Sequence, residues 1–288
     1  MARADELFKG TRYRLEPDYE RPLLQVPEAM VDRMRSRLEL LYGADQVDWT
    51  WQQLERVLRV HHAHSTQEIE AAEAAFDPEE RFTEKDVMLI TYGDLILSDD
   101  RSPLKTLADC AERFFRGIIT SIHVLPFYPY SSDRGFSVVS FDTVDPQLGT
   151  WEDVAELEDD FKLMFDGVFN HVSSKSRWFQ RFLDGHPDYE DFFTVFSTSD
   201  AIDPDHLKLI LRPRTSSVLT RFQTINGPRW VWTTFSADQI DLNFKNPKVL
   251  LKMVEVLLLY IRHGADLLRL DAITYLWCDL GTSCAHLG

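Results

Sequence analysis

From residue 86 onward, short apolar segments alternate with segments of helical periodicity. Predicted strands cover residues 86–92, 118–125, 161–169 and 266–270, and the first is a continuous apolar run typical of a strand buried on both faces of a sheet. Helical patterns cover residues 103–116, 151–158, 173–183 and 247–263. Strands separated by helices in this way predict an α/β fold built on a parallel sheet.

The number of predicted strands leaves two architectures open. A closed (β/α)8 barrel needs eight parallel strands and about 250 residues, whereas four strands are predicted here. The region is therefore either a small open α/β domain or the first half of a barrel. Residues 187–246 break the alternation with aromatic and threonine-rich stretches, and we expect an inserted β-rich subdomain there.

Residues 1–84 have a different, helical character. One amphipathic pattern starts near Val26 and stops at Gly43, a residue type that commonly ends helices. A second helix is predicted over residues 49–75, and it contains three histidines, His61, His62 and His64. These histidines could bind a metal, but a solvated helix face is the simpler expectation. Residues 1–84 are thus predicted to form a helical extension, and residues 85–288 the α/β region.

The composition excludes several classes of function. A net charge of −16 and a pI near 4.9 argue against nucleic acid or an anionic membrane as a partner. The three cysteines, Cys110, Cys278 and Cys284, show no metal-binding spacing, and their odd number argues against a disulfide framework. No secretory signal and no membrane-length apolar segment is recognisable. We therefore expect a cytoplasmic protein without a cofactor or bound metal.

Polar residues follow each predicted strand, at the sheet edge where α/β proteins collect functional groups. They occupy residues 91–94, 123–136, 166–171 and 269–272. Donors and acceptors of this mixture, next to aromatic residues, suit a polyhydroxylated ligand. Arg269 and Asp271 are two residues apart on one strand, so both side chains should point to the same face. A guanidinium there could keep the carboxylate ionised as a nucleophile.

Several of these segments resemble signature motifs of a known family. Asp166-x-x-x-Asn170-His171 and Arg269-x-Asp271-Ala272 are similar to two signature regions of the α-amylase superfamily (glycoside hydrolase family 13). The segment Gln239-Ile-Asp-Leu-Asn243 resembles a third. Further segments are similar to the sucrose phosphorylase branch, and within it most to glucosylglycerate phosphorylases; they cover residues 89–92, 125–136, 211–214, 232–236 and 281–284. The resemblance spans about residues 86–288 and implies the first four βα units of a (β/α)8 barrel.

The resemblance also implies a role for each matching residue. Asp271 would be the nucleophile that forms a covalent glucosyl intermediate, and Arg269 would orient it. Asp133 and His171 would hydrogen-bond hydroxyl groups of the glucosyl unit, and Asp166 would brace Arg269. As alternatives, Asp166 could simply pair within the sheet, and His171 could be a satisfied core histidine.

A phosphorylase of this branch would transfer the glucosyl group to inorganic phosphate and give glucose 1-phosphate with retained configuration. Arg214 would help to bind phosphate or the acceptor, although the sequence favours this role no more than a purely structural one. The expected partners are thus a small glucoside and inorganic phosphate. A retaining α-glucoside hydrolase of the same superfamily is the nearest alternative, and a non-catalytic sugar-binding protein is another.

The sequence departs from the family pattern at two places. Related enzymes use a glutamate acid/base from strand five and an aspartate from strand seven, but Asp279 is the only acidic residue after Asp271. We therefore expect an N-terminal fragment with little or no phosphorylase activity, because loss of a general acid costs on the order of 10²–10⁴ in rate. In addition, Trp277-Cys278-Asp279-Leu280 stands where related sequences carry a basic and an acidic residue.

Overall fold

The computed structural model describes residues 13–79 and 81–287. The chain divides into two compact units. Unit 1 comprises the described residues up to Phe127 together with Thr143–Asp166 and Val254–Arg269. Unit 2 comprises Tyr128–Asp142, Gly167–Met253 and the described residues from Leu270 onward.

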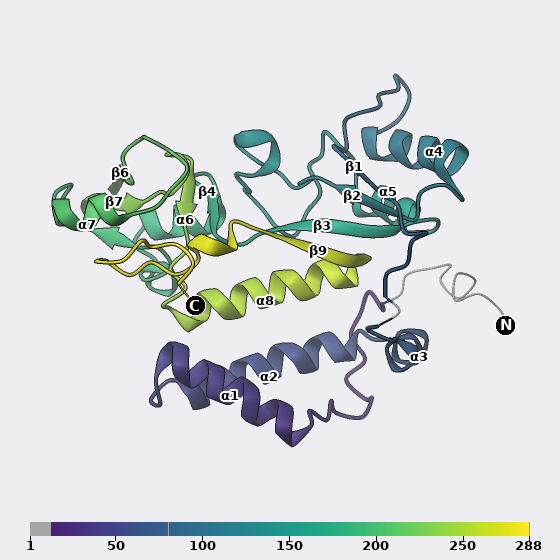
Figure 1. The fold of residues 1–288 in the computed structure, drawn as a ribbon, viewed down its shortest axis with the longest axis horizontal. Coiled ribbons are helices and arrows are strands. Elements are labelled where there is room, and N and C mark those ends of the chain that lie inside the picture. Colours follow the sequence, from purple (N-terminus) through teal and green to yellow (C-terminus); the bar gives the residue numbers. More distant parts are fainter. Residues whose placement is uncertain (1–12, 80, 288) are drawn as a thin grey trace. The chain divides into compact units, whose positions relative to one another are not determined.

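Helices and strands alternate along much of the described chain (Figure 1). The helices are α1 (Glu28–Tyr42), α2 (Val47–Ala63), α3 (Gln67–Ala75), α4 (Pro103–Phe115), α5 (Trp151–Glu158), α6 (Arg177–Leu183), α7 (Pro204–Leu209) and α8 (Pro247–Arg262). The strands are β1 (Met88–Thr91), β2 (Ser121–Val124), β3 (Lys162–Val168), β4 (His171–Ser173), β5 (Val195–Phe196), β6 (Leu219–Thr224), β7 (Gly227–Trp232), β8 (Gln239–Asp241) and β9 (Ala265–Asp271). Short 3₁₀ turns include η2 (Asp133–Gly135) and η4 (Ile273–Tyr275).

A four-stranded sheet of order β1-β2-β3-β9 is the centre of unit 1. β1 pairs with β2 and β2 pairs with β3 in parallel, with Ile122 opposite both Leu89 and Leu163. All four strands predicted from the sequence are thus present, and the prediction of an α/β fold is confirmed. β2 and β3 supply fully buried apolar side chains such as Ile122, Leu163 and Phe165.

β1 differs from its predicted environment. The apolar run suggested a strand buried on both faces, but Met88 and Ile90 are 37% and 62% exposed. The reason is its position, because β1 is an outer strand of the described sheet and has β2 as its neighbour on one side. An apolar run therefore predicts a strand, but it does not predict whether other elements cover one or both faces of that strand.

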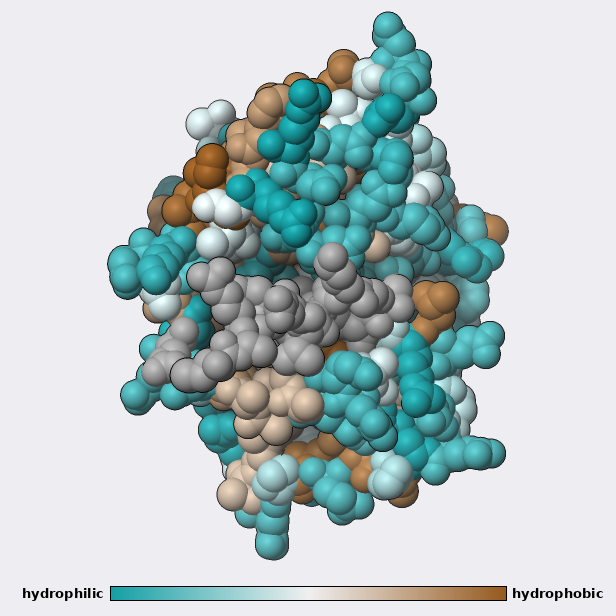
Figure 2. Space-filling model, turned by 90° about the vertical axis from the view of Figure 1, so that its right-hand side faces the viewer, coloured by the Kyte–Doolittle hydropathy of each residue, from teal (hydrophilic) through white to brown (hydrophobic). Residues whose placement is uncertain are grey.

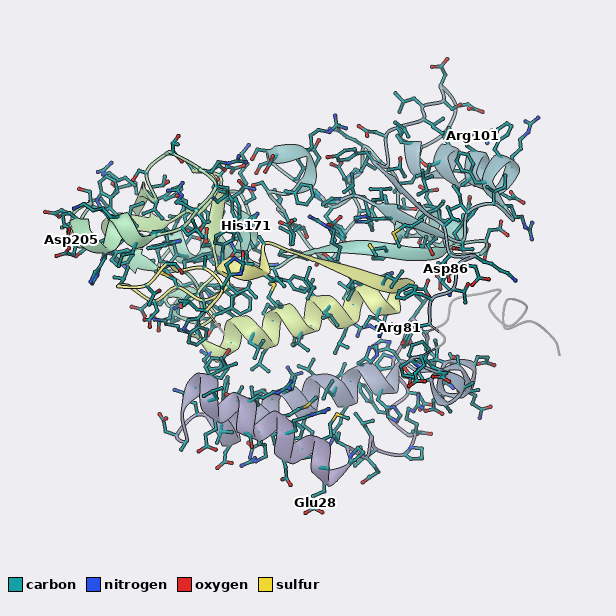
Figure 3. The ribbon with its side chains drawn as sticks, in the orientation of Figure 1. Glu28, Arg81, Asp86, Arg101, His171 and Asp205 are labelled. Carbon is teal, nitrogen blue, oxygen red and sulfur yellow. The ribbon has the colours of Figure 1, made fainter. Side chains whose placement is uncertain are left out.

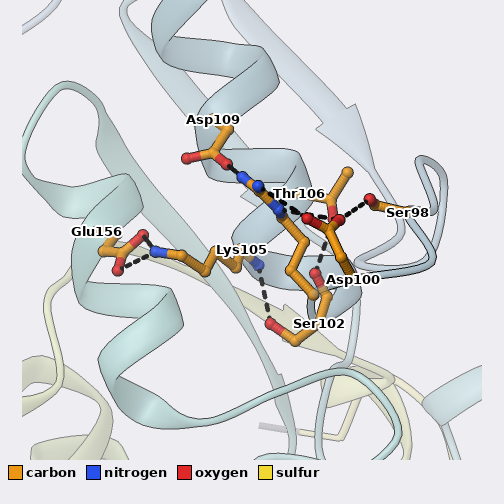
Figure 4. Close-up of polar contacts among 8 residues, drawn as sticks. Ser98, Asp100, Ser102, Lys105, Thr106, Asp109 and Glu156 are labelled. Carbon is orange, nitrogen blue, oxygen red and sulfur yellow. Dashed lines mark hydrogen bonds and ion pairs between the residues drawn. The ribbon is translucent and has the colours of Figure 1, made fainter.

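Polar contacts join α4 to α5 in unit 1 (Figure 4). The Ser102 hydroxyl accepts a hydrogen bond from the Lys105 backbone N–H and so caps the first turn of α4. The Lys105 ammonium binds the carboxylate of Glu156 on α5 at 2.6 Å. Arg101 bonds Asp109 along α4. These exposed contacts fix the helix start more than they add stability.

The α1–α3 region contacts the carboxyl-terminal half of α8 within unit 1. Arg56 on α2 bonds Glu255 at 3.1 Å, and His61 Nδ1 lies 3.5 Å from Nη1 of Arg262, the last residue of α8. On its other side this half of α8 meets the sheet, where Tyr260 packs edge-on against Phe165. Figure 1 shows the same order of sheet, α8 and the α1–α2 pair. The helical N-terminal pattern therefore covers a helix of the α/β unit.

The predicted single helix over residues 49–75 is wrong in one respect, because the chain breaks it into α2 and α3. His64 ends α2, and the hydroxyl of Thr66 accepts the Ile69 N–H to cap α3. A bridge between Tyr13 and Ser65 and a hydrogen bond from Arg14 N–H to the His64 carbonyl occupy the break. Tertiary pairing at residues 64–66 thus overrides the continuing helical periodicity.

Unit 2 contains two small antiparallel sheets, helices α6 and α7, and the first part of α8. One sheet pairs β4 with β8, and the other has the order β5-β7-β6. Phenylalanine rings fill the space between α6 and the second sheet: Phe179 lies 4.8 Å from Phe222 and 5.1 Å from Phe193, centroid to centroid. The aromatic stretches within residues 187–246 therefore form strands and their packing core.

The surface viewed from the side of α3 and α4 is mainly hydrophilic, with hydrophobic residues scattered near its margins (Figure 2). Within the described part of the chain, no helix is both long and apolar enough to cross a membrane.

Candidate active site

A buried carboxylate, Asp166, organises the carboxyl end of β3 in unit 1. Asp166 is fully buried, and its Oδ2 accepts a hydrogen bond from His123 Nε2 at 2.7 Å. Its Oδ1 forms an ion pair with Nη1 of Arg269. Parallel pairing of β2 with β3 places these strand ends at one edge. The predicted Asp166–Arg269 pair is present, and His123 is a third member of it.

β9 contains both residues of the predicted Arg-x-Asp motif. The strand runs from Ala265 to Asp271, and Asp271 is its last residue. The Arg269 side chain is 45% exposed, and Asp271 is half-buried. Ala272 follows in the left-handed conformation with φ 54°, which turns the chain sharply out of the strand. Asp271 therefore sits at a strand terminus with partial access to solvent.

In unit 2, Asp133 lies in a tight turn whose backbone is unusual. Asp133 and Arg134 have φ of 56° and 48°, a conformation that costs energy for residues other than glycine. Asp133 is exposed, and its Oδ2 accepts a hydrogen bond from Gln239 Nε2 at 3.1 Å. The protein thus holds a solvent-facing carboxylate on a fixed, strained turn.

Hydrogen bonds connect Asp133 to the interior of unit 2 through His171. The His171 ring is 1% exposed, and its Nε2 donates to the Phe136 carbonyl at 2.8 Å. Gln239 Nε2 also donates to that carbonyl at 3.2 Å. Burial lowers the pKa of His171 to about 4, although the Phe136 carbonyl and Asp133 oppose the shift. His171 is therefore a neutral imidazole at pH 7 with its proton on Nε2.

The other ring nitrogen of His171 leads to a second buried acid. Asn170 Nδ2 lies 3.3 Å from His171 Nδ1 and donates to Asp241 Oδ2 at 3.1 Å. The Thr234 backbone N–H donates to Asp241 Oδ1 at 2.8 Å, and its hydroxyl donates to Oδ2. Burial raises the pKa of Asp241 to about 7 despite these bonds. We call Asp133, Gln239, His171, Asn170 and Asp241 the His171 network.

A serine cluster fixes the turn that carries Asp133. Asp238, immediately before β8, accepts hydrogen bonds from the hydroxyls of four serines, Ser131, Ser132, Ser137 and Ser174. Burial alone would raise the pKa of Asp238, but these hydrogen bonds outweigh it and hold the pKa below its usual value. The carboxylate therefore ties both ends of the Asp133 turn to β8.

Sequence reasoning gave no role to Asp238, Gln239 or Asp241. A signal was present, since polar Gln239 and Asp241 flank apolar Ile240 in a segment already matched to a family motif. Gln239, Ile240 and Asp241 form β8 and are all buried. β8 pairs with β4, and His171 lies opposite Asp241. Only this antiparallel register reveals that the polar side chains meet.

The predicted phosphate residue, Arg214, is exposed between α7 and β6. Arg212 is the anchored arginine of this segment: its Nε donates to the Thr234 carbonyl at 2.9 Å, and its Nη1 donates to the Ser216 carbonyl at 2.7 Å. Burial and, to a lesser extent, the charge of Arg214 lower the pKa of Arg212. Arg214 thus presents its charge to solvent on a segment that Arg212 holds in place.

Two of the three histidines in and just after α2, His61 and His64, make side-chain contacts with the protein. His61 is half-buried against Tyr13, so the predicted solvated face is wrong for this residue. Burial lowers the pKa of His61 to about 4, helped by Arg262. His64 Nδ1 lies 2.8 Å from the Arg14 carbonyl. Among residues 13–79 and 81–287, no group of three or more His, Cys, Asp or Glu side chains has a metal-binding arrangement.

The amino-acid sequence matches the model of a known protein family. The model of the α-amylase catalytic domain matches residues 117–283, more than half of the chain. The chain belongs to the α-amylase family. This α-amylase family member is 51% identical to the glucosylglycerate phosphorylase of Allomeiothermus silvanus over 207 residues, and 47% identical to that of Escherichia coli over 206 residues. These alignments cover 72% and 71% of this chain, and 36% of each relative.

A third relative and the solved structures agree with this assignment. The glucosylglycerate phosphorylase of Spirochaeta thermophila is 44% identical over 89% of this chain and 42% of its own length. Sucrose 6F-phosphate phosphorylase from Thermoanaerobacter thermosaccharolyticum superposes with a TM-score of 0.64 at 31% identity, over 73% of this chain and 44% of that one. Isomaltulose synthase from Protaminobacter rubrum, at 19% identity and a TM-score of 0.57, shares the fold. The chain thus spans between 36% and 42% of the length of these three curated relatives.

Proposed function

We propose that the chain is part of a retaining phosphorylase that transfers a glucosyl group from a small glucoside to inorganic phosphate. The observation that carries this proposal is the sequence identity of 44–51% to three glucosylglycerate phosphorylases. Because all three relatives are glucosylglycerate phosphorylases, the proposed donor is glucosylglycerate and not sucrose. The proposed product is glucose 1-phosphate with retained configuration, and a cytoplasmic location stays a prediction.

The proposed fold is the first four βα units of a (β/α)8 barrel. Its support is the order β1-β2-β3-β9 together with likeness to a sucrose 6F-phosphate phosphorylase structure. In this proposal the helical extension is residues 1–84, of which 1–12 and 80 lie outside the described residues; the barrel region is residues 85–288, described up to 287, with an insertion at residues 187–246.

In the proposed mechanism of the whole enzyme, Asp271 attacks the anomeric carbon and forms a glucosyl ester, and the aglycone oxygen leaves with a proton from the strand-five glutamate of the family pattern. Its partly exposed place at the end of β9 suits a nucleophile that a sugar must reach. Arg269, braced by buried Asp166, supplies the positive charge that keeps the nucleophile ionised. Phosphate then displaces Asp271 from the anomeric carbon, and this second inversion restores the original configuration.

Asp133 and His171 are proposed to bind hydroxyl groups of the glucosyl unit. Asp133 is an exposed acceptor on a turn fixed by Asp238, which suits this role. His171 Nε2 already donates to the Phe136 carbonyl, so contact with a sugar hydroxyl requires that this carbonyl move or share the proton. We propose that Arg214 attracts phosphate, because it presents a charge to solvent on an anchored segment.

Acceptor choice separates a phosphorylase from a hydrolase of the same family. The chain is first incubated with α-glucosyl fluoride, whose fluoride departs without a general acid, and is then transferred to phosphate or to a phosphate-free buffer. Phosphate, an anionic nucleophile, needs no general base, so we expect it to discharge the glucosyl group as glucose 1-phosphate. Release of free glucose at the same rate in both buffers would instead favour the hydrolase.

Substitution of Arg214 tests its proposed role in binding phosphate. Arg214→Ala should slow discharge by phosphate and leave the slow discharge by water unchanged, because the charge acts on the anion alone. Arg229→Ala, at a half-buried arginine of unit 2 outside that segment, should change neither rate. Equal slowing by both substitutions would remove Arg214 from the proposal.

A further inference from the structure

Cys278 and Cys284 lie side by side in the segment that follows β9. Their Sγ atoms are 3.6 Å apart, and both side chains are free thiols. The sulfur atoms of a disulfide are about 2.05 Å apart, so bond formation requires these two Sγ atoms to approach by about 1.5 Å.

The two thiols differ in access. Cys284 is 4% exposed and belongs to an apolar cluster with Ile202, Val218, Leu219 and Trp232. Cys278 is half-buried at the border of that cluster and lines a small cavity beside Lys245. A reagent from solvent therefore reaches Cys278 before Cys284.

We propose that Cys278 and Cys284 form a reversible disulfide site whose oxidant is a low-molecular-weight disulfide. The Cys278 thiolate attacks one sulfur of that oxidant, forms a mixed disulfide and releases one small thiolate. The Cys284 thiolate then attacks the Cys278 sulfur, closes the intramolecular disulfide and releases the second small thiolate. Two protein thiols are oxidised, one small disulfide is reduced to two thiols, and the thiol protons pass to solvent and to the released thiolates.

The closed loop would act on a neighbouring functional segment. The Ser283 carbonyl, next to Cys284, accepts a hydrogen bond from the Leu211 backbone N–H at 2.8 Å. Leu211 directly precedes Arg212, which anchors the segment of Arg214. Oxidation thus fixes the backbone that supports this arginine segment, and the disulfide itself forms independently of any glucosyl chemistry.

Burial raises the pKa of the Cys278 thiol, with a smaller contribution from Cys284. Because the thiolate is the attacking species, the first step should be slow at pH 7 and faster at pH 9. The nearby cation, Lys245, opposes the shift, and its ion pair with Asp279 at 3.1 Å reduces that effect.

The test uses oxidised glutathione as the probe. The reduced chain is incubated with it, remaining thiols are alkylated in denaturant, and trypsin digestion is followed by mass spectrometry. No Lys or Arg follows Arg269 in the sequence, so both cysteines fall in one tryptic peptide, residues 270–288. We expect two of the three thiols to be lost, with this peptide lighter by two hydrogen atoms and carrying neither glutathione nor alkyl groups.

Two variants test the order of attack. Cys284→Ser should retain glutathione on Cys278, and Cys278→Ser should leave Cys284 as an unmodified thiol until denaturation. Cys110, half-buried on α4, serves as the internal reference in every sample. Two alkylated cysteines in the peptide of the unsubstituted chain, or glutathione retained on it, would overturn the proposal.

Discussion

Unit 1 and unit 2 each contain a buried aspartate, but the two carboxyl groups are stabilised by different partners. Asp166 in unit 1 pairs with the guanidinium of Arg269 and with His123. Asp241 in unit 2 accepts hydrogen bonds from neutral donors, namely the N–H and hydroxyl of Thr234 and the amide of Asn170. The Asp166 carboxylate is thus in contact with a cation, whereas the Asp241 carboxyl group contacts only uncharged N–H, hydroxyl and amide donors.

The difference shows what neutral hydrogen bonds can and cannot do for a buried charge. Three hydrogen bonds leave the pKa of Asp241 at about 7, because desolvation outweighs them and Arg212 acts only as a weak electrostatic partner. Asp241 therefore titrates near neutral pH and is connected through Asn170 to His171. Asp166, in contrast, is a bracing carboxylate with a cationic partner.

The largest expected effect is a pH dependence caused by Asp241. The folded chain binds this proton more tightly than the unfolded chain, so the stability it contributes is fully present below about pH 4 and is lost as pH rises to 7. A pKa near 7 in the folded state corresponds to about 4 kcal/mol over this interval. Asp241→Asn cannot titrate and should lack this loss.

Urea unfolding of both proteins between pH 4 and pH 8 provides the measurement. The free energy of unfolding of the unsubstituted chain, minus that of Asp241→Asn, should fall steadily as pH rises. A difference that is constant with pH would show that Asp241 is no more protonated in the folded chain than in the unfolded one, and the contrast with Asp166 would disappear.

The next effect concerns the brace of unit 1. Asp166→Asn removes the charge that pairs with Arg269 and weakens the hydrogen bond to His123, which is 3% exposed. Loss of a charged hydrogen bond should lower the free energy of unfolding at pH 7 by about 2–3 kcal/mol. Asp205→Asn on α7 (Figure 3), where the carboxylate is 85% exposed, is the control and should cause no measurable change. Equal effects at both positions would contradict the bracing role.

A smaller effect is expected from Gln239 in unit 2. Gln239→Leu removes the donor shared by Asp133 and the Phe136 carbonyl beside His171 (labelled in Figure 3). We expect a loss of about 1–2 kcal/mol in the free energy of unfolding. Gln223→Leu, at an exposed glutamine whose amide bonds the adjacent Thr224 carbonyl, is the matched control. If both substitutions proved neutral, the His171 network would contribute nothing to holding its turn.

The sequence predicted the sheet well because its signal is local. Each of the four strands is a short apolar-rich segment, and α5 begins where Thr150 and Asp153 form a capping box. The break between α2 and α3 was missed, although Thr66 is a recognisable N-cap residue, because the apolar periodicity continues through it. Exposure of β1 could not be predicted, since it depends on which strands lie beside it.

The candidate site was predicted only as a set of residues. The motif around Asp166 and Arg269 led correctly to their ion pair, because both residues end strands of one sheet. The contacts of Asp238 and Asp241 were not predictable, because they arise from a register between β4 and β8 and from a loop more than 90 residues earlier. Sequence patterns identify residue types, whereas the protonation state of Asp241 depends on its surroundings.

The central claim is that Asp271 carries a glucosyl group, and mass spectrometry tests it most directly. The chain is incubated with α-glucosyl fluoride, quenched in acid and digested with trypsin, which places Asp271 in the peptide of residues 270–288. The account predicts one added hexosyl group on Asp271, absent from Asp271→Asn and removed by phosphate. An adduct on any other residue, or an unmodified peptide while fluoride is released enzymatically, would contradict it.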